Sequence, residues 1–241
     1  MDLEDSLQYK CIKLTGSFET GKLGVEAFSG LSGNFDGQGI SFGALQWNFG
    51  QGSLQPLIKK FIALYPQKAQ KIFKEKYLLL YHALDNDILT FAKDIQTSGN
   101  KIFPEWANSF IQLGQTPEMI KIQTEFATLI FNRACNKLKD INTNLQYPIE
   151  SERAIALMFD IVVQNGGIRK NIQYLYGELK KDISEVDKLR AIANHVANSC
   201  KEEWKNDVLS RKMCIANGSG IVHKTQYNLE DYGIKITKAV I

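Results

Sequence analysis

Apolar residues recur at helical spacing along most of the chain. Leu14 and Phe18 have the i,i+4 spacing of neighbours on one helix face, and they predict a helix that ends at Gly21. A second helical pattern starts after Pro56. The further amphipathic helices that the pattern predicts cover 68–82, 85–96, 104–112, 117–139 and 184–210. The chain is therefore expected to be mostly helical.

The segment 150–165, ESERAIALMFDIVVQN, has almost no polar face, so we expect this helix in the middle of the domain. The one convincing strand signal covers 40–47, which lies among glycines and predicts a short hairpin arm. No repeat or composition break divides the sequence. We therefore expect one domain over 1–241 of the mostly α (α+β) class, with a β-containing lobe at 17–53 and a helical lobe at 54–241.

Composition and charge exclude several classes of protein. The 241 residues are 44% hydrophobic, which is enough for a sizeable core, and 29 basic against 26 acidic residues are too balanced for a nucleic-acid-binding surface. No apolar run reaches the roughly 18 residues that span a membrane, and the acidic start lacks the pattern of a signal peptide.

The three histidines and four cysteines show no metal-ligand spacing, so we expect neither a metal site nor another cofactor. Scattered cysteines are typical of free thiols in a reducing compartment. A bridge between Cys200 and Cys214 is the alternative.

Candidate catalytic residues lie in the glycine- and aromatic-rich run from Ser17 to Ser53. Glu19 would sit in the last turn of the first helix, where aromatic neighbours would partly desolvate it and favour the protonated form of a general acid. Asp36, beside glycines on an open loop, would stay ionised. Cleavage of a glycosidic bond commonly uses such a pair of carboxyl groups. The alternative is a solvated helix-end charge and a turn residue, and spacing alone does not decide between them.

The runs SFETG and NFDGQGISFG resemble the bacterial chitosanases of glycoside hydrolase family 46, within the lysozyme-like superfamily. The resemblance implies a lysozyme-like fold in which Glu19 is the general acid and Asp36 activates the attacking water. Ser41 falls where the family has a threonine that helps to hold this water. The resemblance also implies inversion of the anomeric carbon, which requires the two carboxyl groups to lie roughly 6.5–9.5 Å apart. The closing segment RKMCIANGSGIVHKTQYNL resembles uncharacterised peptidoglycan-associated bacterial and phage proteins that carry the same two runs.

The apolar helix carries a weaker part of the resemblance. MFDIVVQNGG is similar to the family's buried helix, in which an aspartate matched here by Asp160 joins an arginine network that reaches the catalytic glutamate. A buried carboxylate needs a cationic partner, because an unpaired buried charge costs several kcal/mol. Arg211 is the first candidate and Arg190 the second, and a purely structural ion pair is the alternative to a catalytic role. The pair Arg211 and Lys212 also has the pattern of a solvated helix face.

Two positions depart from the chitosanase pattern. Gln38 replaces an arginine of the family's loop, and Ser53 replaces an acidic residue that faces a glucosamine ammonium group in chitosanases. The predicted substrate-binding residues are Gln38, Gln46, Trp47, Asn48 and Ser53. Amides can bond acetamido groups and Trp47 can stack on a pyranose face, with core packing of the hairpin as the alternative for Trp47 and Phe49. The neutral set favours the N-acetylated sugars of peptidoglycan over chitosan.

The sequence therefore predicts a glycosidase that cleaves the β-1,4-linked glycan of peptidoglycan. The alternatives are a chitosanase, a lytic transglycosylase that needs only Glu19, and a non-catalytic wall-binding module. Because the start lacks a signal-peptide pattern, we expect delivery from the cytoplasm to the wall or periplasm of a target cell by a secretion system or by phage lysis, as a bacteriolytic effector or endolysin. The expected partners are peptidoglycan glycan strands and a cognate immunity protein. We expect a monomer without nucleic-acid or membrane partners.

Overall fold

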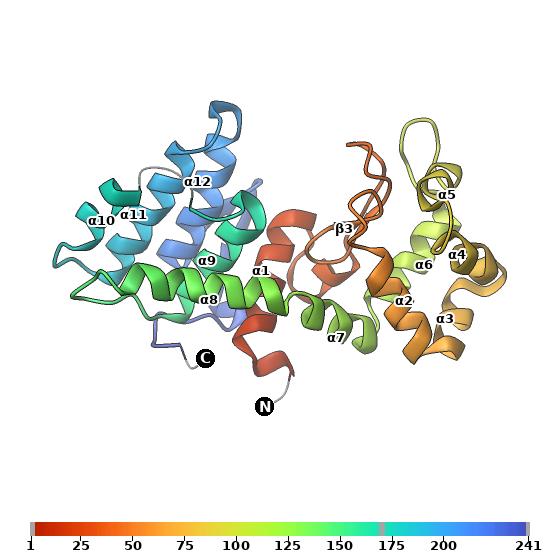
Figure 1. Ribbon diagram of the computed structural model, residues 1–241, viewed down its shortest axis with the longest axis horizontal. Coiled ribbons are helices and arrows are strands. Elements are labelled where there is room, and N and C mark those ends of the chain that lie inside the picture. The colour runs from red at the N-terminus through yellow and green to blue at the C-terminus, as the bar shows by residue number, and fades with distance from the viewer. Residues whose placement is uncertain (1–2, 169–171, 240–241) are drawn as a thin grey trace. The chain divides into compact units, whose positions relative to one another are not determined.

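The structure is a computed structural model that describes residues 3–168 and 172–239 (Figure 1). The chain forms two compact units. Unit 1 comprises Met1–Phe18 and Ala127–Ile241, and unit 2 comprises Glu19–Phe126. The boundary falls inside helix α1 (Leu7–Thr20), whose end agrees with the helix predicted to stop at Gly21.

Unit 2 contains the glycine-rich run and the helices that follow it. Its three-stranded antiparallel sheet has the order β1–β2–β3, and Phe42 of β2 pairs with Leu31 and Trp47. The hairpin arm predicted at 40–47 is confirmed only in part, because Ser41–Phe42 and Trp47–Asn48 are two short strands joined by a turn. The elements are η2 (Gly24–Ser29), β1 (Leu31–Ser32), β2 (Ser41–Phe42), β3 (Trp47–Asn48), α2 (Gln55–Leu64), α3 (Pro66–Phe73), η3 (Lys74–Lys76), α4 (Tyr77–Ala83), α5 (Ile88–Asp94), α6 (Pro104–Gly114) and α7 (Pro117–Phe126).

Gln123 of α7 connects the helices of unit 2 to its β element. The side chain is fully buried, its Nε2 donates to the Phe28 carbonyl at 2.8 Å, and its Oε1 accepts the Ala44 N–H at 2.9 Å. A buried amide needs such partners, so these bonds fix the hairpin against α7. Unit 2 therefore runs to Phe126, whereas we expected the β-containing lobe to end at residue 53.

Unit 1 is built around α9 (Glu152–Asn165). Every residue from Ala154 to Val162 is buried, and three helices pack on this helix, α8 (Thr128–Asn142), α11 (Glu185–Asn198) and α12 (Glu202–Asn217) (Figure 1). The Ser151 side chain accepts the Ala154 N–H at its start, and Gly166 ends it with φ 68°, a conformation that favours glycine. The predicted central helix is confirmed. The other elements are η1 (Leu3–Asp5), α8 (Thr128–Asn142), α10 (Ile172–Leu179), α11 (Glu185–Asn198), α12 (Glu202–Asn217), β4 (Ser219–Val222), β5 (Thr225–Asn228) and η4 (Leu229–Tyr232).

The C-terminal part of unit 1 differs from the sequence expectation. The helix predicted over 184–210 is two helices, α11 and α12, and at the break the side chains of Ser199 and Cys200 donate to the carbonyls of His195 and Ala197. A hairpin, β4–β5, follows α12, where we predicted no strand.

The expected mostly α class with a small β element is confirmed. Within the described ranges, no helix combines the length and the apolar character that crossing a membrane requires.

Candidate active site

Glu19 lies in the last turn of α1 and is half-buried. The helix stops immediately after it, because Gly21 takes φ 69° and the Thr20 hydroxyl accepts the Lys22 N–H at 3.2 Å. The preceding residue, Phe18, is buried in unit 1, where its ring meets Tyr227 edge-on. Glu19 therefore lies at a helix end whose backbone is fixed on one side by the packing of Phe18.

Asp36 lies at the exposed tip of the loop between β1 and β2. Its Oδ1 accepts the Gln38 N–H at 3.0 Å, which closes a tight turn over Gly37. Gly37 and Gly39 both have φ 80°, a backbone conformation that other residues rarely adopt. The expected open loop with an exposed carboxylate is present.

The base of this loop is held by the side chains of Asn34 and Gln96. The Asn34 Oδ1 accepts the Gly39 N–H at 2.8 Å, and the Asn34 N–H donates to the Gln96 Oε1 at 2.8 Å. Gln96 is itself buried and donates to the Ala92 carbonyl of α5. Sequence reasoning missed both residues, since only the fold brings Gln96 to the loop. They restrict the position of Asp36 while leaving its carboxylate in solvent.

Ser41 lies half-buried on β2, where it pairs with Ser32 of β1 and Asn48 of β3. It belongs to the same compact unit as Glu19 and Asp36. The three residues with predicted catalytic roles are thus all in unit 2, two of them on the sheet and its connecting loop.

We call the five predicted substrate-binding residues the substrate rim: Gln38, Gln46, Trp47, Asn48 and Ser53. Its members Gln46, Asn48 and Ser53 take part in hydrogen bonds within the hairpin. Gln46 has φ 52°, and its side chain accepts from the Ser32 hydroxyl at 2.8 Å and donates to the Gly43 carbonyl at 2.9 Å. The Ser53 hydroxyl accepts the Asn48 N–H at 3.0 Å. These bonds stabilise the turns on which the rim was expected to lie.

The rim is also less open than predicted. Trp47 is 9% exposed and Asn48 is 7% exposed, and Phe49 is buried as well. Core packing of the hairpin, the alternative for Trp47 and Phe49, is what the structure shows. This leaves little exposed surface on Trp47 or Asn48 for the predicted sugar contacts. Gln38 is half-buried, and a side chain on the facing Gly50 would clash with it.

Asp160 is the buried anion of unit 1. It is completely buried on α9, and its Oδ1 and Oδ2 bind the Arg211 guanidinium, at 2.6 Å, and the Lys212 ammonium. Burial alone would raise the pKa of Asp160, but the two cations lower it to about 2. The predicted pairing with Arg211 is confirmed. Lys212 was missed, and the solvated helix face predicted for Arg211 and Lys212 is wrong, because both side chains are buried.

Arg190 does not belong to this cluster. It lies on α11, where it donates to the Asn217 side chain at 2.8 Å and pairs with Asp187 at 3.0 Å. The side chains of Arg190 and Asp187 are about half exposed. Its prediction as a second partner of Asp160 is therefore corrected.

A line of polar side chains connects Asp160 to the surface of unit 1. The Lys212 ammonium also donates to the Gln164 Oε1 at 2.5 Å, and Gln164 donates to the Asp207 Oδ2 at 2.7 Å. The other oxygen of Asp207 contacts the His223 ring in the β4–β5 turn. The cluster thus ties α9, α12 and the hairpin together.

Arg211 also approaches α1, the helix that carries Glu19. Its guanidinium lies over the Phe18 ring, 5.4 Å from the ring centroid. Phe18 immediately precedes Glu19 in α1. The cation that neutralises Asp160 therefore also packs against the residue before the candidate acid.

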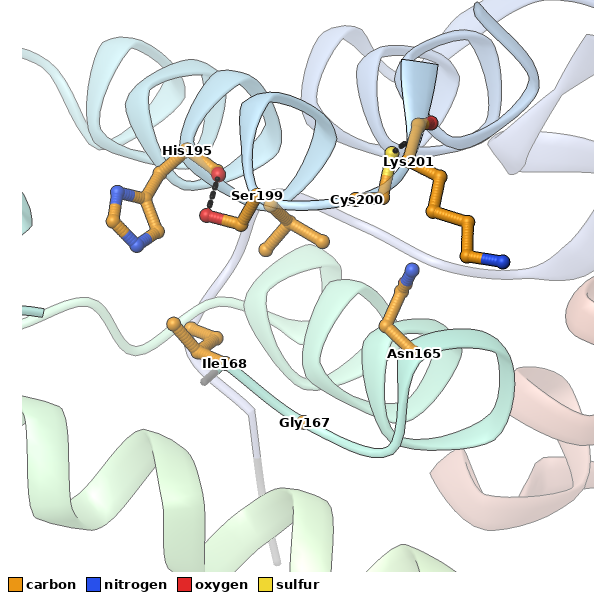
Figure 2. Close-up of a pocket in the computed structure, with 8 residues that line it drawn as sticks. Asn165, Gly167, Ile168, His195, Ser199, Cys200 and Lys201 are labelled. Atoms are coloured by element: carbon orange, nitrogen blue, oxygen red, sulfur yellow. Dashed lines mark hydrogen bonds between the residues drawn. The ribbon is translucent and has the colours of Figure 1, made fainter. Parts of the chain in front are cut away.

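Figure 2 shows a separate cavity of about 490 Å³ in unit 1, at the end of α9 and α11. Ser199 donates to the His195 carbonyl on its wall, and none of the predicted catalytic residues lines it. The lining residues are Asn165, Gly167, Ile168, His195, Val196, Ser199, Cys200 and Lys201. Cys200 is a free thiol, as are the other three cysteines, so the alternative of a Cys200–Cys214 bridge is excluded.

No cluster of three or more His, Cys, Asp or Glu side chains suited to a metal ion occurs in the described part of the chain.

Comparison with known proteins adds evidence for the fold. No protein-family model and no curated protein matches the sequence. Among solved structures, a chitosanase described as a complex structure is similar at TM-score 0.55 and 15% identity over 91% of this chain and 95% of that one. The native chitosanase from Bacillus subtilis MY002 is similar at TM-score 0.55 and 17% identity over 90% of this chain and 89% of its own. At such identities the similarity is one of fold, and the fold of this chain is that of the chitosanases.

Proposed function

We propose that the protein is a glycoside hydrolase that cleaves the β-1,4-linked glycan of peptidoglycan. The observation that carries the proposal is the pairing of a chitosanase-like fold over about nine-tenths of the chain with carboxyl groups of different surroundings at Glu19 and Asp36. Glu19 is half-buried at a helix end, whereas Asp36 is exposed on a fixed loop.

The two carboxyl groups divide the work of an inverting glycosidase. Glu19 protonates the leaving glycosidic oxygen, and Asp36 takes a proton from the water that attacks the anomeric carbon from the opposite face. Ser41 on β2 holds this water. The bonds of Asn34 at the loop base support this assignment, because a general base acts efficiently only when its position is restricted.

The choice of peptidoglycan rests on the uncharged groups around the β element. Gln38 and Ser53 are neutral where chitosanases carry charged groups, and the Ser53 hydroxyl is bonded to the backbone of Asn48. A site without an anion at this position loses a reason to prefer a cationic glucosamine. Delivery as a bacteriolytic effector or endolysin, with an immunity protein as partner, stays a prediction from the sequence.

Digestion of purified peptidoglycan sacculi tests the proposal. The wild-type protein should release soluble muropeptides with reducing ends, detected by mass spectrometry, and Glu19→Gln should lower the rate roughly 10²–10⁴-fold because the amide cannot donate the proton. Glu105→Gln is the matched control, since Glu105 is an exposed glutamate of the same unit, on α6. It should retain the wild-type rate.

Other products would contradict parts of the proposal. Anhydro-muropeptides would identify a lytic transglycosylase, in which the muramyl 6-hydroxyl replaces water. Cleavage of chitosan but not of sacculi would overturn the substrate argument from Ser53. If the protein releases no products from either polymer, the remaining alternative is a non-catalytic wall-binding module.

A further inference from the structure

Among the residues that the structure describes, Phe35 is the one phenylalanine with an exposed side chain. Its exposed fraction is 75%, while the other phenylalanines are buried or half-buried. It immediately precedes Asp36 at the tip of the β1–β2 loop. A single exposed apolar side chain is common on protein surfaces and does not by itself indicate a binding site. The evidence for a role of Phe35 is the way in which the loop holds it.

The loop holds the backbone of Phe35 between fixed points. Its N–H donates to the Gly33 carbonyl at 2.9 Å, and Asn34 on one side is bonded to both Gln96 and Gly39. On the other side, Asp36 closes the turn to Gln38. The loop is therefore a short, cross-bonded turn, and its geometry keeps the Phe35 ring out of the core.

Gly33 shows how closely this loop is packed at its base. A Cβ atom at this position would lie 1.8 Å from the Asn100 carbonyl oxygen and 2.5 Å from the Gln96 Oε1. The backbone of the loop therefore lies directly on these neighbours and has little room to shift. An aromatic ring that the chain cannot bury itself is available to a ligand.

The chemistry beside the ring indicates the kind of ligand. The exposed residues next to Phe35 are Asp36 and Gly37, and between Leu23 and Ile58 the sequence contains no lysine or arginine. The loop itself therefore offers no cation with which to bind an anionic membrane surface or a nucleic acid. A β-1,4-linked pyranose offers an apolar face of axial C–H bonds, which an uncharged aromatic ring can cover.

We propose that Phe35 is a stacking platform for a sugar ring of the glycan strand, bound next to the glycosidic bond that is cleaved by the water Asp36 activates. The inference rests on the proposed function in taking the ligand to be a glycan. It assigns to Phe35 the stacking role that burial denies to Trp47. Phe35 is a binding residue, and it takes no part in proton transfer.

Binding of the inactive Glu19→Gln protein to insoluble sacculi tests the platform without turnover. Adding Phe35→Ala to this protein should weaken binding roughly 5- to 10-fold. Phe35→Trp should retain or strengthen binding, whereas Phe35→Leu should behave like alanine, because it is apolar but has no aromatic face. The matched control is Trp204→Ala, which removes an aromatic side chain that is 58% exposed on α12 and should leave binding unchanged.

Two outcomes would overturn the platform. Binding by Phe35→Ala equal to that of its parent would exclude it, and equal binding by Phe35→Leu and Phe35→Trp would replace stacking by a simple apolar contact. In the active protein, Phe35→Ala should raise KM with little change in kcat, since the platform binds substrate and transition state alike.

These experiments distinguish failure of the hydrolase proposal from failure of the stacking proposal for Phe35. If wild type releases no products from sacculi while Phe35→Ala still weakens binding, the hydrolase proposal fails and the platform stands. If wild type digests sacculi and Phe35→Ala changes neither binding nor KM, the platform alone fails.

Discussion

Asp36 and Asp160 are the same residue type in opposite surroundings. Asp36 is exposed at a loop tip and accepts a backbone N–H from Gln38. Asp160 is completely buried and binds the side chains of Arg211 and Lys212. The first carboxylate keeps lone pairs available for a water molecule, while the oxygens of the second are engaged by cations.

The difference follows from what burial requires of a charge. An ionised group in the interior loses its hydration, and only charged partners with good geometry offset that loss. Asp160 therefore stabilises unit 1, where it links α9 to α12. Asp36 makes few contacts with its own chain, which leaves it able to act on another molecule. Changes to the two residues should accordingly affect different measurements.

The largest effect on stability is expected for Asp160→Asn. The amide has the same shape but removes the negative charge that neutralises Arg211 and Lys212 in the interior. The free energy of unfolding should fall by about 3–5 kcal/mol in urea titrations at pH 7. Asp187→Asn is the control, because it removes an aspartate paired with Arg190 whose side chain is 50% exposed. That variant should lose less than about 1 kcal/mol, and an equal loss in both would contradict the comparison.

The next effect is the pH dependence that Asp160 confers. Its pKa is about 2 in the folded protein, below the value of about 3.9 for an unfolded aspartate. The stabilisation is therefore complete above pH 5 and is lost as the pH falls toward 2, because the unfolded chain binds the proton first. The gap in unfolding free energy between wild type and Asp160→Asn should narrow by roughly 2–3 kcal/mol over this range. If the difference in unfolding free energy between the two proteins does not change with pH, the folded protein does not lower the pKa of Asp160.

The smallest effect on stability is expected for Asp36→Asn. The amide oxygen can still accept the Gln38 N–H, and the side chain is exposed, so the free energy of unfolding should change by less than about 0.5 kcal/mol. Urea titration beside Asp160→Asn measures this directly. A loss of several kcal/mol would mean that Asp36 has a structural role.

The sequence predicted the parts of the fold that have local signals. The end of α1 follows from Gly21, and the central helix α9 follows from its apolar run between Ser151 and Gly166. Asp160 could be assigned a cationic partner because a charge inside such a run cannot stay unpaired. These features depend on neighbours in sequence or on a general energetic rule.

Other features depend on contacts that sequence spacing does not reveal. The β4–β5 turn uses His223 and Lys224 at positive φ, 51° and 69°, in place of the Asn-Gly or Asp-Gly pairs that identify such turns. The break between α11 and α12 contains no glycine or proline. Lys212 was assigned to a solvated face, since only the packing of α12 on α9 brings it to Asp160.

The candidate site also combines residues that the sequence predicts with contacts that it does not reveal. Glu19 and Asp36 could be proposed from motif resemblance and turn chemistry, and the structure places them as a helix-end and a loop-tip carboxyl group. The sequence left core packing open for Trp47, and it gave no signal for the burial of the polar Asn48, which depends on how the hairpin packs in unit 2. The anchoring of the Asp36 loop by Gln96 depends on a contact across 62 positions of sequence.

The role of Asp36 as base is tested most directly by the rate at which Asp36→Asn releases soluble products from peptidoglycan sacculi, compared with wild type at equal folded protein. We expect a loss of roughly 10²–10⁴-fold with unchanged stability, because the amide cannot accept the proton of the attacking water. A rate within about twofold of wild type would contradict the role of Asp36 as base.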